Sequence, residues 1–385
     1  MSNISDLQLS KDLIKFQSVS PDDAGIMNYL EKKLKLIGFK TKILVFKDKN
    51  TRPVKNIYAR LGTKRPNFCY AGHVDVVPPG DIKNWSSNPF IPTIRNGKLI
   101  GRGASDMKTS VASFIAATSD FVNKNRKFKG SISVLITGDE EGEAINGTKK
   151  VVEYLKKKKE KIDFCLVGEP TNPSRMGEMI KIGRRGSITG HLSVFGKMGH
   201  VAYNQKAINP STCIVDILKS LKQLKLDNGS KHFQPSNLEI TKINIKNTAD
   251  NVIPGDACAT FNVRFNDKHN SISMKKKLNE CIKRVCKRHK CKFGIEYNVS
   301  GESFITKPNK VTHMIKNIIK KITKINTKLS TTGGTSDARF IRKISPCLEF
   351  GIVGAGMHQI NESINLRDLK ILTKIHREIL NNYFL

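Results

Sequence analysis

The sequence predicts an α/β protein, a mainly parallel sheet with helices on both faces, that carries a smaller inserted domain. In the first part of the chain, short apolar runs alternate with helical segments, a pattern typical of a parallel sheet covered on both sides. From about Arg184 the order becomes strand, helix, strand, strand, helix, strand, as in the split βαβ unit of ferredoxin-like domains. The length of 385 residues suits two domains, and 38% hydrophobic residues can fill two cores.

The elements of the first part follow from the spacing of apolar residues. Helical spacing predicts helices over 7–16 and 25–37, and further helices from Met107 and from Gly147. Strands are predicted near 42–46 and in the segments NIYARL, NFCYAG, ISVLIT and DFCLVG. In such sheets ligands bind outside the carboxyl ends of the strands.

The inserted part is complete in itself. Its predicted strands are 187–196, 237–246, 257–265 and 292–300, and its predicted helices are 210–224 and 271–289. A helix near 311–322 and the strand segment CLEFGIVG then resume the first pattern. We therefore expect one domain made of 1–182 and 298–385, and an inserted domain of 183–297.

The net charge of +34 comes from 67 basic and 33 acidic residues. It would indicate nucleic-acid binding if the basic residues formed one stripe with interleaved aromatic residues. Lysine is instead spread over nearly every predicted helix, the run KKKKEK from Lys156 lies on an ordinary helix, and aromatic residues are only 7%. We interpret the excess as solvated surface, and the weaker alternative is steering of an anionic substrate. We expect no nucleic-acid partner.

The cysteines and the start of the chain predict a cytoplasmic protein. The eight cysteines are scattered, as expected of reduced thiols that serve as small core residues. A zinc site of Cys281, Cys286, His289 and Cys291 is conceivable, but the helical spacing favours an amphipathic helix that buries two cysteines. No apolar run approaches the roughly 18 residues that span a membrane. The polar first residues lack a signal-peptide pattern.

Side chains that bind metals or carry protons follow several predicted strands. They are His73 and Asp75, Asp106, Glu140 and Glu141, Glu169, and His358. Imidazoles mixed with carboxylates suit a pair of zinc-like ions, whereas all-oxygen sets suit calcium or magnesium. The pattern therefore predicts a two-metal hydrolase.

Two of these stretches leave alternatives open. Asp75 can accept the proton on the second nitrogen of the His73 imidazole, which would fix its tautomer, although such a pair is more often structural. Asp106 precedes a helix from Met107, where backbone amides favour a carboxylate. It can cap that helix, bridge two cations, or do both.

Glu140 and Glu141 follow a buried strand. Because successive side chains leave an extended backbone on opposite sides, one can bind metal while the other faces the bound water. A solvated acidic turn is the alternative, which the preceding apolar strand makes less attractive. Glu169 also ends an apolar strand, and His358 lies in the loop after CLEFGIVG.

These motifs together resemble the zinc-dependent aminoacylase and acetylornithine deacetylase group of metallohydrolases over essentially the whole chain. The matching stretches are HVDVVP, GRGASDMKTSVAS, TGDEEG, VGEPT, RRGSITG, GHVAY, NVIPG, VRF, GGTSDARF and HQINESI. Within the group, RRGSITG, GGTSDARF and the H-x-x-N-E end are similar to the desuccinylases of the lysine and diaminopimelate pathway. A sibling deacylase, such as an acetylornithine deacetylase or a dipeptidase, is the alternative.

The resemblance implies a role for each of the candidate residues. His73, Asp106 and Glu169 would hold one zinc ion, Asp106, Glu141 and His358 the other, and cobalt could replace zinc. Glu140 would be the general base, and the peptide bond after Asp106 would be cis. The inserted domain would act as a lid and dimerisation domain.

The resemblance also implies substrate contacts. His200 would reach the active site of a homodimer from the partner subunit and steady the oxyanion, although a surface turn is the plainer interpretation of this histidine. The residues that would grip substrate carboxylates are Arg185, Ser187, Asn251, Arg264, Gly334, Thr335 and Ser336. Arg264 offers a bidentate fork, and the GGTS turn, which can also be only a tight turn, offers amides at a helix start. Ala338 replaces the group's usual glycine at a position that we expect to be helical, where alanine is favoured.

Overall fold

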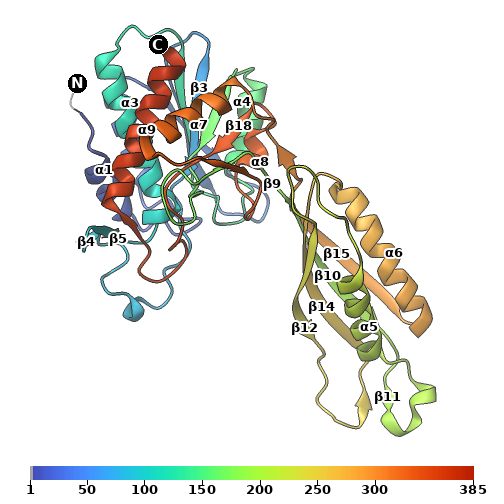
Figure 1. The fold of residues 1–385 in the computed structure, drawn as a ribbon. Helices are drawn as coiled ribbons and strands as arrows, with labels where there is room; N and C mark the ends of the chain where they lie inside the picture. Colours follow the sequence, from blue (N-terminus) through green and yellow to red (C-terminus); the bar gives the residue numbers. More distant parts are fainter. Residues whose placement is uncertain (1–2) are drawn as a thin grey trace. The chain divides into compact units, whose positions relative to one another are not determined.

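The computed structural model describes residues 3–385, and its contacts divide the chain into two compact units (Figure 1). Unit 1 takes in the chain up to Ile182, Thr306–Ser330 and Ser336–Leu385, and unit 2 takes in Gly183–Ile305 and Thr331–Thr335. The functions predicted for the two domains, and their boundaries, stay predictions.

Unit 1 is built on an eight-stranded mixed sheet. In spatial order the strands are β1 (Lys40–Phe46), β2 (Val54–Leu61), β6 (Ser131–Thr137), β3 (Asn67–His73), β7 (Phe164–Val167), β18 (Cys347–Glu349), β8 (Met179–Lys181) and β17 (Lys328–Ser330). The pairs β6/β3, β3/β7, β7/β18 and β8/β17 are parallel. The β1/β2, β2/β6 and β18/β8 pairs are antiparallel. The link between β1 and β2 is too short for a parallel crossover, which explains this antiparallel edge.

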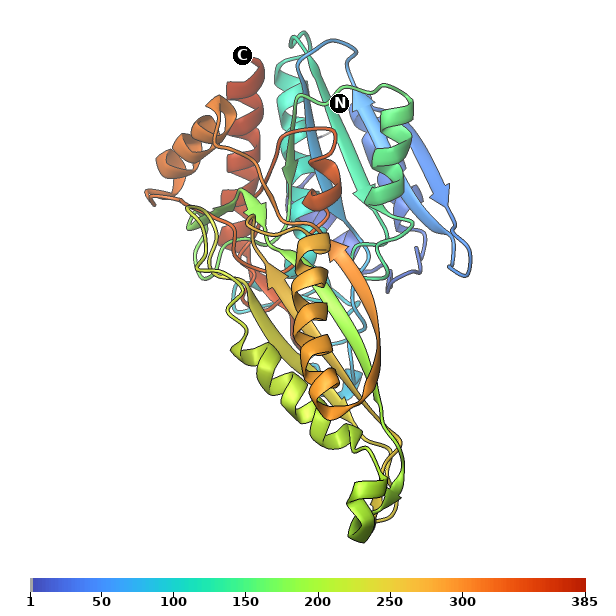
Figure 2. The same ribbon diagram turned by 90° about the vertical axis from the view of Figure 1, so that its right-hand side faces the viewer.

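Helices cover both faces of this sheet, which confirms the predicted fold class (Figures 1 and 2). They are α1 (Asp6–Ile14), α2 (Ile26–Ile37), α3 (Thr109–Lys124), α4 (Thr148–Lys157), α7 (Lys310–Thr323), α8 (Ala338–Ile341) and α9 (Leu366–Phe384). Helix α3 is buried along almost its whole length because alanine, serine and threonine let α1 and α9 pack closely against it. Helix α4 packs on α8, β2 and β6.

Short elements border the carboxyl ends of the central strands. A small sheet consists of β19 (Ser363–Asn365), β5 (Lys98–Ile100) and β4 (Thr93–Arg95). One turn of 3-10 helix, η1, spans Ile82–Asn84, and a kinked segment, η2 (Ala104–Lys108), whose backbone is not helical at Asp106 and Met107, precedes α3. Ala338 begins α8, as predicted for a helical position, and is buried.

Unit 2 has the predicted βαββαβ order. Its antiparallel sheet runs β12 (Asn237–Asn244), β14 (Asp256–Phe265), β10 (Gly186–Phe195) and β15 (Lys292–Gly301), with helices α5 (Pro210–Gln223) and α6 (Ser271–His289). Burial alternates along β14, so that Phe261, Val263 and Phe265 enter the core beneath the helices. Smaller elements, which the sequence did not indicate, are β9 (Gly183–Arg184), β11 (Gly199–His200), η3 (Val201–Lys206), β13 (Val252–Ile253) and β16 (Phe304–Ile305).

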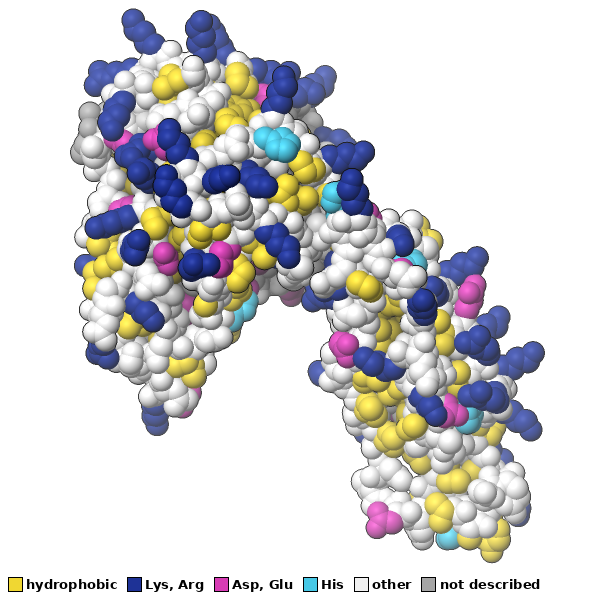
Figure 3. Space-filling view, in the orientation of Figure 1, with side chains coloured by type: hydrophobic (Ala, Val, Ile, Leu, Met, Phe, Trp, Pro, Cys, Tyr) yellow, Lys and Arg dark blue, Asp and Glu magenta, His cyan; other side chains and the backbone are white. Residues whose placement is uncertain are grey.

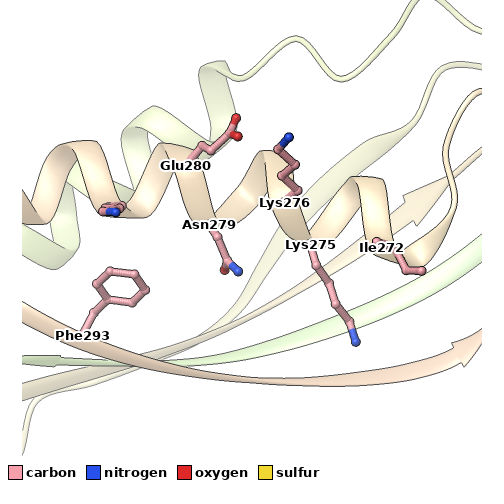
Figure 4. Close-up of a pocket in the computed structure, with 7 residues that line it drawn as sticks. Ile272, Lys275, Lys276, Asn279, Glu280 and Phe293 are labelled. Atoms are coloured by element: carbon pink, nitrogen blue, oxygen red, sulfur yellow. The ribbon is translucent and has the colours of Figure 1, made fainter.

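Helix α6 is amphipathic and buries Cys281 and Cys286, which confirms the structural interpretation of its cysteines. A shallow groove runs between α6 and β15 (Figure 4). It is lined by Ile272, Lys275, Lys276, Asn279, Glu280, Lys283 and Phe293.

Lysine and arginine side chains are scattered over the face of the molecule that Figure 3 shows, with apolar and neutral surface between them. They form no continuous stripe on that face. Across residues 3–385, no helix has the length and apolar character needed to cross a membrane.

Candidate metal centre

The candidate ligands meet at the carboxyl ends of neighbouring strands. His73 is the last residue of β3, and Glu169 lies just beyond β7. Glu140 and Glu141 follow β6, and His358 lies in the loop between β18 and β19. Because β6, β3, β7 and β18 are adjacent and parallel, residues after their ends converge on one edge of the sheet.

Asp106 lies between two imidazoles. Its Oδ1 atom is 3.1 Å from Nε2 of His73, and its Oδ2 atom is 3.3 Å from Nε2 of His358. Nε2 of His358 is in turn 2.7 Å from Oε1 of Glu141. A carboxylate that turns one oxygen toward each imidazole has the geometry expected of a bridge between two cations.

Two groups of possible ligand atoms share His73. The atoms of His73, Asp106 and Glu141 lie within 4.8 Å of one another, and so do those of His73, Glu140 and Glu169. Carboxylates gathered this closely with little exposure repel one another unless cations lie between them. The donor set of nitrogen and carboxylate oxygen therefore fits zinc.

The backbone around Asp106 is not helical. Its φ and ψ are −125° and 99°, and the peptide bond to Met107 is cis, as the resemblance implied. Helix α3 begins only at Thr109, with Lys108 at its N-cap position, so the alternative that Asp106 caps the helix is wrong. The turn instead aims the Asp106 carboxylate at the two imidazoles.

Asp75 acts differently from the prediction. Nδ1 of His73 donates to the backbone carbonyl of Asp75 at 3.0 Å, whereas the Asp75 carboxylate is 3.6 Å away. That carboxylate accepts hydrogen bonds from the amides of Glu140 (3.2 Å) and Glu141 (3.0 Å) and from the Ser20 hydroxyl. The carbonyl still leaves Nε2 of His73 facing Asp106, and the carboxylate fixes the turn that carries the two glutamates.

The electrostatics of the site distinguish Glu140 from Asp106. Burial, with added repulsion from Glu169 and Asp337, raises the pKa of Glu140 well above its ordinary value. Burial also acts to raise the pKa of Asp106, but the hydrogen bonds from His358 and His73 outweigh it and the pKa falls. A carboxyl group whose pKa is raised at such a cluster is suited to accept and return a proton.

The histidines respond to the same carboxylates. Hydrogen bonds to Asp106 and then Glu141 raise the pKa of His358 to about 10. Burial acts to lower the pKa of His73, but its hydrogen bond to Asp106 raises the pKa well above its ordinary value. Both imidazoles therefore face strong negative potential, which also favours a bound cation.

One set of predicted substrate residues lies at the start of β10. Ser187 pairs with Arg264 of β14, whose other neighbour is Asn237 of β12. Nη1 of Arg185 donates to Oδ1 of Asn237 at 2.7 Å. Nη1 of Arg264 is buried and has no hydrogen-bond partner among the described residues, and burial lowers the pKa of this guanidinium. Nη1 of Arg264 is therefore a buried donor without an acceptor in the described part of the chain.

The GGTS segment is divided between the units. A side chain on Gly334 would meet no atom within 4 Å, so the space beside it is open. Gly333 has a φ of 107°, and a Cβ there would lie 2.4 Å from Nη1 of Arg184. Thr335 also belongs to unit 2, whereas Ser336 is buried in unit 1 and donates to Glu349 at 2.6 Å. The Ser336 hydroxyl is thus already engaged.

A second set lies beyond the opposite end of β10. His200 is on β11, which pairs with β13, and the carbonyl of Asn251 accepts from the amide of Val201 at 3.0 Å. His200 is exposed, and its Nδ1 accepts from the amide of Ala202 at 3.1 Å. The ten residues of β10 span about 30 Å, so one copy of unit 2 does not bring Arg264 and His200 together.

Comparison with known proteins shows the family of the chain. The model of peptidase family M20/M25/M40 matches residues 69–382. The chain belongs to this family. A succinyl-diaminopimelate desuccinylase of Pelagibacter ubique is 64% identical over 384 residues, covering 100% of both chains. One of Parvibaculum lavamentivorans is 47% identical over 378 residues, covering 98% of this chain and 95% of the relative.

The fold agrees with a solved member of the family. The M20 family metallo-carboxypeptidase Sso-CP2 from Sulfolobus solfataricus superposes with a TM-score of 0.78. The alignment covers 100% of this chain and 99% of that chain at 18% identity. At this identity the likeness concerns the fold alone.

Proposed function

We propose that the chain hydrolyses N-succinyl-LL-2,6-diaminopimelate to succinate and LL-2,6-diaminopimelate, a step of lysine and diaminopimelate biosynthesis. The observation that carries the proposal is the identity of 64% with the desuccinylase of Pelagibacter ubique along the whole of both chains. The cluster of imidazoles and carboxylates supports it, because cleavage of an unactivated amide needs a strong nucleophile and a polarised carbonyl.

Two zinc ions are part of the proposal, and cobalt can replace them. His73, Asp106 and Glu169 would hold one ion, and Asp106, Glu141 and His358 the other. Asp106 contacts both histidines, which supports the sharing. When bound, such ions supply a nucleophilic water at neutral pH and polarise the scissile carbonyl.

Glu140 moves the proton in this proposal. It takes a proton from the attacking water and returns it to the leaving amine. The rise in its pKa that burial causes supports this, because it makes the Glu140 carboxylate a stronger proton acceptor. Asp75 positions Glu140 through the backbone amide.

Substrate carboxylates would be held by Arg185, Ser187, Asn251, Arg264, Gly334, Thr335 and Ser336. The buried Nη1 of Arg264, which has no partner in the described part of the chain, supports its role as a carboxylate donor. A role of Ser336 in holding a substrate carboxylate has weaker support, because the Ser336 hydroxyl already donates a hydrogen bond to Glu349.

We also propose a homodimer. The separation of about 30 Å along β10 supports it, because Arg264 and His200 can serve one active site only if they come from different copies. The outer strand β15 offers an open edge, and the groove between α6 and β15 runs along it (Figure 4). A second copy pairing with this edge would form the symmetric contact of a two-fold dimer.

The cytoplasmic location stays a prediction. The eight cysteines are all free, and most are buried, as expected in a reducing compartment.

A substrate panel with zinc-loaded protein tests the activity. A site built around buried donors rejects an analogue that lacks the matching carboxylate. We expect kcat/KM for N-succinyl-LL-diaminopimelate to exceed that for N-acetylornithine by at least about 100-fold. Comparable rates would indicate a sibling deacylase, and protein that binds nucleic acid but hydrolyses neither substrate would refute the proposal.

Two arginine variants test the pocket. Arg264→Ala is expected to lower kcat/KM for N-succinyl-LL-diaminopimelate more than kcat/KM for N-acetylornithine. The ratio of the two values should therefore fall. Arg288→Ala is the matched control, because this exposed arginine of α6 bonds only to Asp216 among the described residues. Unchanged preference in Arg264→Ala would contradict the role of Arg264.

Mixing two inactive variants tests the dimer. Glu140→Ala and His200→Ala proteins, unfolded together and refolded, are expected to recover part of the activity through hybrid dimers. A fully active monomer by sedimentation would contradict this part of the proposal.

A further inference from the structure

Glu362 is a buried carboxylate that organises the turn before the bridging aspartate. Its Oε1 atom accepts from the amides of Ser105 (2.7 Å) and Asp106 (2.9 Å). Its Oε2 atom accepts from the amide of Gly103 (3.0 Å) and from Nη1 of Arg102 (2.7 Å). The side chain is 1% exposed, so the four donors replace its hydration.

Arg102 extends these contacts to the loop that carries His358. Besides Glu362, its guanidinium donates to the carbonyls of Gln359 (3.3 Å), His358 (3.4 Å) and Pro78 (3.3 Å). Pro78 lies in the segment after His73 and Asp75. Cζ of the guanidinium lies over the Trp85 ring, 5.2 Å from its centre. One buried ion pair thus joins three segments that bear candidate ligands.

The backbone reinforces the same connection. The amide of Gly101 donates to the carbonyl of Glu362 at 2.9 Å, and the Ser105 hydroxyl donates to the carbonyl of Val353 at 3.1 Å. Contacts from Val353 and Glu362, on either side of His358 in the chain, therefore hold the turn that carries Asp106.

We infer that Glu362 is a positioning residue that, with Arg102, holds Asp106 and His358 at the spacing the second metal ion requires. Neither side chain contacts the reacting atoms in this inference. It rests on the proposed function, because it takes Asp106 and His358 to be ligands. Partners behind the ligands commonly matter nearly as much as the ligands themselves.

Glu362→Gln tests the inference with little change in volume. One oxygen can still accept from two amides, but the new amide group would point hydrogens at donors, the Gly103 amide and Arg102. We expect zinc affinity at one site to fall by about 10- to 100-fold. We also expect kcat to fall at limiting zinc, KM to stay within about twofold, and the absorption spectrum of the cobalt form to change.

Asp163→Asn is the matched control. Asp163 also accepts from a backbone amide, that of Asn67 (2.7 Å), and from an arginine, Arg65. It precedes β7, at the amino end of the parallel strands, away from the candidate ligands. The metal affinity, cobalt spectrum and kcat of the Asp163→Asn variant are expected to match those of the wild type.

The outcomes separate the two proposals. Wild-type protein that binds no zinc would overturn both. Wild-type protein that binds two ions, with Glu362→Gln unchanged in affinity and spectrum, would overturn this inference alone, as would equal losses in Asp163→Asn. If Glu362→Gln does not unfold cooperatively, Arg102→Lys is measured instead, because it keeps the carboxylate and its three amide bonds but shortens the reach to His358. Unchanged zinc affinity in that variant would likewise overturn the inference.

Discussion

Replacing Glu140 and Glu141 one at a time by glutamine separates proton transfer from metal binding. The Asp75 carboxylate holds both backbone amides, so each substitution leaves the turn in place. The side chains then diverge. Oε1 of Glu141 is 2.7 Å from Nε2 of His358, whereas Oε1 of Glu140 is 4.0 Å from Nη1 of Arg339.

The expected magnitudes differ accordingly. Glu140→Gln removes the proposed proton acceptor and should lower kcat by about two to four orders of magnitude, roughly 3 to 5 kcal/mol of barrier, while two zinc ions stay bound. Glu141→Gln removes a charged group that we propose as a metal ligand beside His358. It should leave about one ion bound after dialysis, and added zinc should restore part of the activity.

Metal content by mass spectrometry and kcat at saturating zinc decide the matter. Glu143→Gln is the control, because Glu143 lies on the same acidic turn but is exposed. It should behave as the wild type. If the phenotypes of the Glu140 and Glu141 variants were exchanged, the assignment of base and ligand would be reversed, and if both lost metal equally, neither would be the base.

Three further outcomes are expected. Chelation should abolish activity and lower the midpoint of thermal unfolding in calorimetry, because the clustered carboxylates then repel one another, and an indifferent enzyme would contradict the metal proposal. Gly168→Ala should cost about 1 to 3 kcal/mol in denaturant unfolding, because its Cβ would lie 1.8 Å from Oη of Tyr70, whereas Gly255→Ala has open space and should cost little. Burial lowers the pKa of His376 to about 3, so its contribution to stability is complete above the unfolded pKa near 6.5 and is lost as the pH falls toward 3. His376→Gln should therefore flatten the acid limb of unfolding free energy against pH, and an unchanged limb would refute the assignment.

The sequence predicts the larger elements well because their apolar residues recur over several turns or strand repeats. The helix predicted for 271–289 coincides with α6, and the βαββαβ order of unit 2 is confirmed. The candidate metal ligands could be predicted from the sequence for a related reason. Each follows a buried strand or precedes the helix next to one, and parallel topology brings such positions to one edge.

Short elements and local contacts could not be predicted in the same way. Strands β11 and β13 have two residues each, which is too few to show a period. The pattern H-x-D also leaves undecided which oxygen of Asp75 faces the imidazole. The outcome depends on the amides of Glu140 and Glu141, which donate hydrogen bonds to the Asp75 carboxylate. The Asp75 carbonyl then accepts the hydrogen bond from His73.

The pair of Arg102 and Glu362 shows the limit most clearly. In the sequence they are two charged residues 260 positions apart. Arginine and glutamate usually lie on the solvated surface, so nothing in the sequence indicates that this pair is buried. Burying such a pair costs several kcal/mol per ion unless further hydrogen bonds replace the lost water. Here the amides of Gly103, Ser105 and Asp106 supply three of them, in a turn whose backbone leaves the helical conformation at Asp106. The irregular turn and the buried carboxylate therefore support each other, and both hold Asp106, which we propose as the bridging ligand.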